Sequence, residues 1–348
     1  MTKSTWILLA LTLAAGLASL TAGAADISLA AVLTGDAEAL HVLLASRLPR
    51  LAAVLCTGVG MSIAGLIMQQ LCANKFVSPT TGATISSAQL GILIALLFFP
   101  DSNLWSRAAF AFLAAIAGTW VFVWFILRIP MKDPVMVPLI GIMFGNVIGG
   151  ITSFLAFRFD MTQALSTWLV GHFSLVLRGN YELVYLVVPL IAAAWIYAKW
   201  FNIVGMGKEF SKNLGVNYSL VLFAGLSIAA MITASVVTVV GSISYIGLIV
   251  PNLVAIFKGD DLRATLPDTA LFGALFVLIC DVIGRLIIMP YELPIELIIG
   301  TVGSLLFIVL IFYRLRFGRR SLTKDRLLEL FGLTRRARPA CCNPAVIK

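Results

Sequence analysis

The chain has 348 residues, of which 60% are hydrophobic and only 12% are charged, and its mean hydropathy is +1.02. Globular proteins carry about a quarter charged residues, so a soluble enzyme is excluded and a membrane protein is expected. Inside a bilayer only helices and closed barrels satisfy the backbone. Because the long apolar runs do not alternate with polar residues, the sequence predicts an all-α fold rather than a barrel.

Ten apolar segments follow one another along the chain. The eighth is short and contains Gly247 and Pro251, a pattern typical of broken helices beside a transport pathway. We therefore predict one polytopic membrane domain of about ten transmembrane helices over residues 1–317, followed by a basic cytoplasmic tail over residues 318–348. The ten segments lie at residues 6–25, 51–72, 80–99, 107–128, 135–157, 183–200, 218–241, 244–257, 268–289 and 294–313.

The net charge of +9 indicates orientation rather than nucleic-acid binding, because the basic residues lie in the tail and in short loops. With the N-terminus inside, nineteen Lys and Arg fall on the inner side and six on the outer side. This asymmetry predicts a multi-pass protein of the cell inner (cytoplasmic) membrane with both termini in the cytoplasm. The first segment also resembles a cleavable signal peptide, whose removal would leave nine spans.

No constellation of residues predicts catalysis. The two histidines, His41 and His172, lie at no metal-ligand spacing from Cys, Asp or Glu, so we expect neither a metal nor a cofactor. The string from Asn202 to Glu209 lacks the first glycine and the Ser or Thr of a phosphate-binding loop. Asp281 and Arg285 are four residues apart and can pair, either for function or as a structural ion pair. We therefore do not expect an enzyme.

Seven ordered motifs resemble those of one transporter family: the permease subunits of binding-protein-dependent ABC importers for iron siderophores, haem and cobalamin. The resemblance covers nearly the whole chain. It implies two cytoplasmic ATPase subunits that hydrolyse ATP, a second permease subunit, and a periplasmic or lipid-anchored binding protein. The motifs are Arg47-Leu48-Pro49-Arg50, Ala64-Gly65-Leu66-Ile67-Met68-Gln69, Asn74 to Pro79, Gly207 to Asn217, Gly247-Leu248-Ile249-Val250-Pro251, Asp281 with Arg285, and Glu292-Leu293-Pro294.

The resemblance implies a docking site at the outer side. Arg47, Arg50 and Arg285 match the positions at which the family's permeases receive glutamates of the binding protein. The planar and permanently charged guanidinium suits a carboxylate. As an alternative, these arginines anchor helix ends at the lipid head groups.

The resemblance also implies two cytoplasmic sites. Asn74 and Phe76 match part of a cytoplasmic gate, with Lys75 between them as a departure from the usual Asn-Pro-Leu pattern. Residues 207–217 resemble the coupling loop that presses into the ATPase, where Leu214 and Val216 would supply apolar contact; the alternative is an ordinary polar loop. The residues expected to couple are Lys208, Glu209, Lys212, Leu214, Gly215 and Asn217.

Two departures and one likeness bear on the substrate. At the position of Asn252 the family commonly has histidine, and at the position of Glu296 it commonly has glycine. The runs from Phe76 to Gly82 and from Ser87 to Gly91 look most like permeases for ferric siderophores of the catecholate and anguibactin or petrobactin type. We therefore expect a ferric siderophore as substrate and a different paralogue as the second permease subunit, although a pair of identical chains stays open. The alternatives are a haem or cobalamin permease and an ion-coupled secondary transporter.

Overall fold

The computed structural model describes residues 3–21, 36–81, 83–101, 103–128, 136–179, 181–259, 261–289 and 291–317. Within these ranges the chain is helical, and the one β pairing is an isolated bridge between Val170 and Ser242. The predicted all-α class is therefore confirmed. The predicted basic tail lies outside the described residues.

Each of the ten predicted spans overlaps one main helix. Eight of the described helices are long and apolar enough to cross a membrane, by length and composition, whereas α5 and α12 are shorter. Ten crossings therefore stay a prediction. The main helices are α1 (Lys3–Thr21), α4 (Leu48–Leu71), α5 (Thr84–Phe98), α6 (Leu104–Arg128), α7 (Met136–Arg158), α9 (Val187–Gly205), α11 (Tyr218–Val240), α12 (Ile246–Lys258), α13 (Leu262–Leu286) and α14 (Ile295–Phe317), and the short ones are α3 (Ala37–Val42), α8 (Thr162–Leu169) and α10 (Lys208–Asn213).

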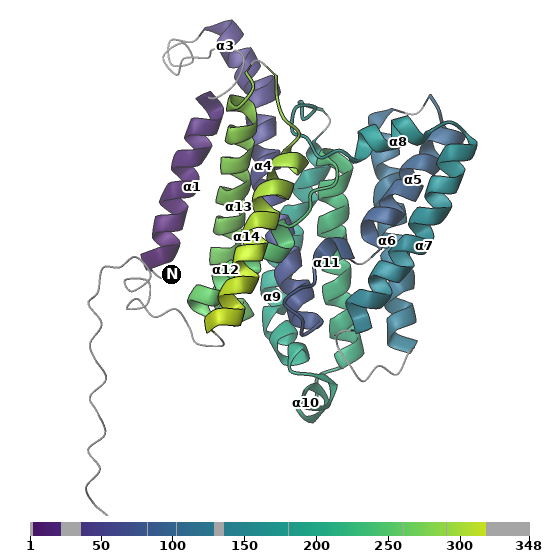
Figure 1. The fold of residues 1–348 in the computed structure, drawn as a ribbon, viewed down its shortest axis with the longest axis vertical. Coiled ribbons are helices and arrows are strands. Elements are labelled where there is room, and N and C mark those ends of the chain that lie inside the picture. Colours follow the sequence, from purple (N-terminus) through teal and green to yellow (C-terminus); the bar gives the residue numbers. More distant parts are fainter. Residues whose placement is uncertain are drawn as a thin grey trace, which may run out of the picture.

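The helices form a bundle around α4 and α11, which are the most buried of the membrane-length helices. Figure 1 shows α1, α12, α13 and α14 on one side of these two helices and α5, α6, α7 and α8 on the other. The helix α10 lies at the same end of the bundle as the start of α1, and α3 and α8 lie at the opposite end (Figure 1). We call these the inner end and the outer end, following the predicted orientation.

Glycines let α4 approach its neighbours with backbone against backbone. A Cβ atom on Gly65 would lie 1.9 Å from the carbonyl oxygen of Gly247 in α12. A Cβ atom on Gly58 would lie 2.5 Å from the carbonyl oxygen of Gly273 in α13. Because lipid gives helices no hydrophobic reason to associate, such close packing is what holds membrane helices together.

We expect Gly65→Ala to lower the stability of the bundle, because the added methyl group forces α4 and α12 apart. Overpacking of this kind costs about 1–3 kcal/mol. Thermal unfolding of the purified chain in detergent measures the loss. Gly150→Ala in α7 is the matched control, since a Cβ atom there meets nothing within 4 Å. Equal melting behaviour of the two variants would contradict the close crossing.

Polar contacts join α1 to α13 at both ends. At the inner end the Thr5 hydroxyl donates to Asp268 at 2.9 Å, and Lys258 of α12 forms an ion pair with the same carboxylate. At the outer end Arg285 donates from Nη1 to the carbonyl oxygen of Ser19 at 2.9 Å. Charged groups of α13 thus find partners on α1 instead of facing lipid, where an unpaired charge is costly.

Candidate functional site

Arginines and carboxylates gather at the outer end, where three segments meet. Arg47 ends a short π-helix (Leu43–Arg47), and Arg50 follows in the first turn of α4. The π-helix runs directly into α4, and because Pro49 lacks an N–H, the carbonyl oxygen of Ala45 accepts instead from the N–H of Arg178 at 3.1 Å. Asp281 and Arg285 come from the end of α13. We call this group, together with Glu292 from the loop between α13 and α14, the outer charge cluster.

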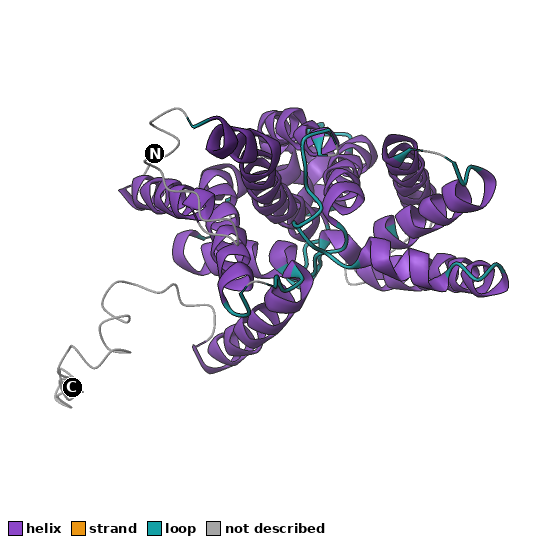
Figure 2. Cartoon of the chain, turned by 90° about the horizontal axis from the view of Figure 1, so that it is seen from above, coloured by secondary structure: helices purple, strands orange, loops and turns teal. Residues whose placement is uncertain are grey.

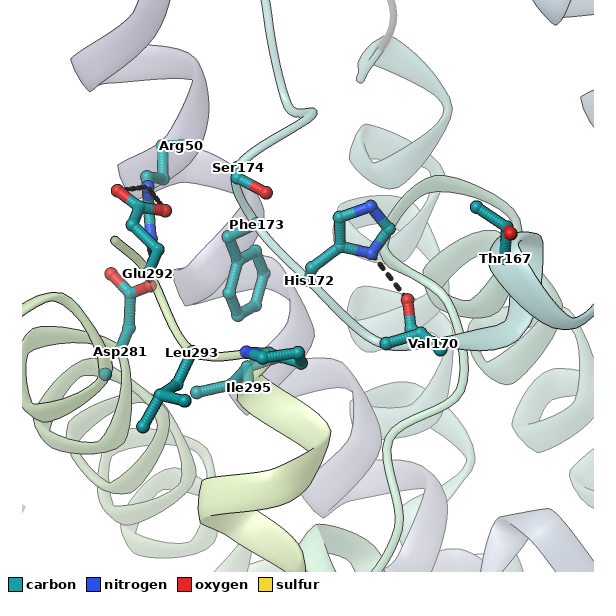
Figure 3. A pocket seen from close by; sticks show the side chains of 12 residues that line it. Arg50, Thr167, Val170, His172, Phe173, Ser174, Asp281, Glu292, Leu293 and Ile295 are labelled. Carbon is teal, nitrogen blue, oxygen red and sulfur yellow. Dashed lines mark hydrogen bonds and ion pairs between the residues drawn. The ribbon is translucent and has the colours of Figure 1, made fainter. Parts of the chain in front are cut away.

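Arg50 binds both carboxylates of the outer charge cluster (Figure 3). Its Nη2 and Nε donate to Oδ1 of Asp281 at 2.8 and 3.3 Å. Its Nη1 lies 2.9 and 2.8 Å from the two carboxylate oxygens of Glu292. Charge-assisted bonds of this kind are about twice as strong as neutral ones, so α4 is tied both to α13 and to the turn between α13 and α14.

The predicted pairing of Asp281 with Arg285 is confirmed, because Nη2 of Arg285 binds Oδ2 of Asp281. Arg285 is only 2% exposed, and Arg47 is also buried. The expected contact of the three arginines with a partner protein stays a prediction. For Arg285 that contact would require its bonds to Asp281 and Ser19 to break.

A cavity of about 280 Å³ opens beside the outer charge cluster. Arg50, Asp281 and Glu292 form one wall, and His172 and Ser174 lie across from them (Figure 3). The cavity therefore offers a ligand one guanidinium that is already paired with two carboxylates, and further polar side chains opposite. Its other lining residues are Thr167, Val170, Phe173, Gly284, Leu293, Pro294 and Ile295.

An extended segment, residues 170–173, follows α8 and lines this cavity. The N–H of Ser242 donates to the carbonyl oxygen of Leu169 at 2.9 Å, and that of His172 donates to Val240 at 2.9 Å. On its other side, the N–H of Glu296 donates to the carbonyl oxygen of Gly171 at 3.3 Å. The segment thus runs between the end of α11 and the start of α14, and Figure 2 shows loops crossing the middle of the bundle seen from above.

The predicted gate residues lie in the loop after α4. The Asn74 side chain accepts a hydrogen bond from the N–H of Phe76 at 2.9 Å. Phe76 is 54% exposed, and its ring meets that of Phe307 in α14 edge to face at 6.1 Å. A bulky apolar ring is therefore placed at the inner end against α14, but its gating role stays a prediction.

Asn252 holds this gate loop in place, which the sequence did not predict. It is fully buried in α12, and its Nδ2 donates to the carbonyl oxygen of Lys75 at 2.6 Å and to that of Leu248 at 2.7 Å. The sequence feature that pointed to this position was the asparagine in place of the family's usual histidine. The structure shows that the replacement still supplies a donor to the loop.

We expect Asn252→Leu to loosen the gate loop, because it leaves the partly buried carbonyl group of Lys75 without this donor. An unsatisfied buried polar group costs about 1–3 kcal/mol. Limited proteolysis at Lys75 should therefore become faster than in the wild type. The Asn252→His variant retains a donor, so the protease should cleave it more slowly than the Asn252→Leu variant. Identical cleavage of all three proteins would show that Asn252 does not restrain the loop.

The expected coupling segment forms α10 and the turn after it, at the inner end (Figure 1). All six residues named for coupling are exposed. Leu214 is 55% exposed, and Phe210 beside it adds a second exposed apolar side chain. Val216, which was expected to share the apolar contact, is instead buried, so that expectation is wrong. Its N–H donates to the carbonyl oxygen of Ser211 at 2.9 Å, which turns its side chain inward.

Two further contacts shape the coupling segment. Gly215 has φ +72°, a conformation that favours glycine, and the Asn217 side chain caps α11 by accepting from the N–H of Leu220 at 3.2 Å. Ser211 is buried and donates to the carbonyl oxygen of Gly207 at 2.8 Å. These bonds give the segment a defined shape that exposes Leu214.

In the described part of the chain, no three His, Cys, Asp or Glu side chains gather as around a metal ion.

Comparison with known proteins gives concordant matches. A family model described as the FecCD transport family matches residues 11–313. The petrobactin import system permease protein YclN of Bacillus subtilis (strain 168) is 47% identical over 272 residues, which are 78% of this chain and 86% of that protein. The ferric-anguibactin transport system permease protein FatD of Vibrio anguillarum is 37% identical over 290 residues, 83% of this chain and 92% of that one.

One solved structure shares the fold. It is a metal-chelate type ABC transporter in an inward-facing conformation, and it matches with a TM-score of 0.75 at 23% identity. The match covers 88% of this chain and 98% of that one. The arrangement of helices described above is therefore the fold of that structure.

Proposed function

The chain belongs to the FecCD transport family, and from this premise we propose that it is the membrane-spanning permease subunit of an ABC importer for a ferric siderophore. The observation that carries the proposal is the 47% identity, over 78% of the chain, to a permease named for petrobactin import. A second relative is named for ferric anguibactin. Both names fall in the siderophore group that the motifs predicted.

The chain is a transporter subunit, and the work of ATP hydrolysis falls to a separate cytoplasmic ABC ATPase dimer in this proposal. The ATPase binds the exposed face of α10, with Leu214 as an apolar contact. An acidic siderophore-binding protein, periplasmic or lipid-anchored, docks on Arg47 and Arg50, while Arg285 supports Arg50 through their shared partner Asp281. A second permease subunit, of a different sequence, completes the pathway.

Alternating access links these sites. Closure of the ATPases on binding ATP displaces α10, and α7 and α14 rearrange so that the pathway opens to one side at a time. The contact of Phe76 with Phe307 supports this account, because a movement of α14 would draw the gate ring away from its partner.

Uptake of radiolabelled iron chelates in a strain that lacks this gene tests the proposal. We expect uptake of a petrobactin-type or anguibactin-type ferric siderophore to be lost and to return with the gene. Loss of haem or cobalamin uptake alone would indicate a permease for those ligands instead. Uptake that survives ATP depletion but collapses with the ion gradient would indicate a secondary transporter.

Reporter fusions test the proposed orientation in the cytoplasmic membrane. A reporter fused after Arg316 should be active only in a cytoplasmic form, and one inserted beside Tyr181 only in an external form. The excess of Lys and Arg in the predicted inner loops is the reason. An external signal after Arg316 would overturn the orientation and, with it, the contact of α10 with an ATPase.

A further inference from the structure

The hydrogen-bond donors of the Arg50 guanidinium are shared between two carboxylates, one buried and one reached by solvent. Its Nε and Nη2 face Asp281, whose side chain is 2% exposed and is also held by Arg285. Its Nη1 faces Glu292, whose side chain is 29% exposed. The inner half of the guanidinium is therefore locked in the bundle, whereas the outer half is bound to a group that solvent can reach.

Backbone hydrogen bonds lie on both sides of Glu292. The N–H of Leu293 donates to the carbonyl oxygen of Gly284 at 3.1 Å, and that of Tyr291 donates to Ile288 at 2.8 Å. These bonds hold the turn between α13 and α14. Release of Arg50 by Glu292 thus needs only a change of side-chain rotamer, which is fast in exposed residues.

The surroundings of this bond suit an acidic partner. The 280 Å³ cavity beside Arg50 has room for a side chain, with Ser174 and His172 across from the guanidinium (Figure 3). Tyr291, next to Glu292 in the chain, is 75% exposed, and tyrosine is frequent at the centre of protein interfaces. With three arginines and two carboxylates, the outer charge cluster keeps an excess positive charge that attracts carboxylates.

We propose that Glu292 occupies the place of a partner's carboxylate on Nη1 of Arg50, and that an acidic protein docks by exchanging its own carboxylate for Glu292. The inference rests on the proposed function, since the acidic protein would be the importer's binding protein. The exchange replaces one charge-assisted pair by another, so Arg50 is never left uncompensated in a half-buried site. Docking by exchange is also readily reversible, as repeated delivery requires.

The test measures how often Arg50 is released from its carboxylates, with the full chain in lipid nanodiscs. Phenylglyoxal reacts with two nitrogens of a guanidinium group, so loss of the Glu292 bond removes one of the two barriers to its reaction with Arg50. Mass spectrometry locates the adducts, and tri-glutamate serves as the carboxylate probe. In Glu292→Gln the charge-assisted pair is lost, so adduct formation at Arg50 should be about tenfold faster than in the wild type. Tri-glutamate should protect Arg50 in this variant at about tenfold lower concentration, and tri-glutamine should not protect it.

Matched variants separate exchange from a general charge effect. Glu38→Gln removes the same charge from an exposed residue of α3 at the outer end and should behave as wild type. Glu292→Asp keeps the charge with a shorter reach and should fall between the wild type and Glu292→Gln. Adducts at the exposed Arg158 normalise the reagent.

The proposal is overturned if Glu292→Gln leaves the reactivity of Arg50 unchanged, or if tri-glutamate protects this variant at the same or a higher concentration. The second result would mean that Glu292 positions Arg50 for its partner instead of competing with it. The chelate uptake experiment is independent of this result. An exchange that holds in a chain without siderophore uptake would refute the importer and leave the carboxylate site standing.

Discussion

Replacing Gly215 with tryptophan is expected to abolish siderophore uptake and association with the ATPase, while the chain still inserts in the membrane in normal amount. Gly215 has φ +72°, where any other residue adds strain of about 1–3 kcal/mol. The indole would also stand beside Leu214, the apolar group that we expect to enter the ATPase. Uptake, co-purification with the ATPase and membrane quantity are the three measurements.

Gly179→Trp is the matched control for this prediction. Gly179 also has a positive φ, of +98°, and a Cβ atom there meets nothing within 4 Å, but it lies in the loop between α8 and α9 rather than beside α10. Strain at this position, which is at least as great at φ +98° as at φ +72°, should leave ATPase association intact. Gly215→Ala adds strain without bulk and should have an intermediate effect. Normal uptake in Gly215→Trp would show that residues 207–217 only connect α9 to α11.

Replacing Arg50 with glutamine is expected to weaken docking of the binding protein by about 2–5 kcal/mol, because one member of a partly buried charge pair is lost. Arg50→Lys should be less harmful, since lysine keeps the charge and loses only the bidentate fork. Arg50→Glu is less informative, because a third carboxylate beside Asp281 and Glu292 would destabilise the outer end itself. Binding of the loaded protein to nanodiscs, at low and high salt, measures the series.

Arg158→Gln is the control for docking, since Arg158 is exposed at the end of α7 and takes no part in the outer charge cluster. It should bind the partner as the wild type does. Higher salt should weaken binding of the partner to the wild type if the ion pair between Arg50 and the partner's carboxylate stays partly solvated. Binding by Arg50→Gln as tight as that of the wild type would favour the alternative, in which these arginines anchor the chain at the head groups.

The membrane architecture was predictable because lipid imposes its own pattern on the sequence. Every predicted span overlaps a helix, since a span must be apolar along its whole length. The predicted family is confirmed by the match over residues 11–313. The third span was placed too early, at residue 80. A 3₁₀ turn at Pro79–Thr81 precedes α5, which begins only at Thr84.

The contacts of the candidate site were less predictable, because they join distant parts of the chain. Arg50 and Glu292 are 242 positions apart, and Asn252 and Lys75 are 177 apart. No periodicity in the sequence reports such pairs. Val216 was misplaced because its apolar side chain suited either an ATPase or the bundle, and the structure buries it in the core of the bundle.

The glycine crossings of α4 limit how this protein can move. At Gly65 and at Gly58 no side chain separates α4 from α12 and α13, so no rotamer change can absorb a sliding motion there. We therefore expect the three helices to tilt together as one stiff frame rather than to shear past one another. That frame carries the outer charge cluster at one end and, through Asn252, the gate loop at the other. We therefore expect a load applied to the outer end to reach the gate loop with little mechanical loss.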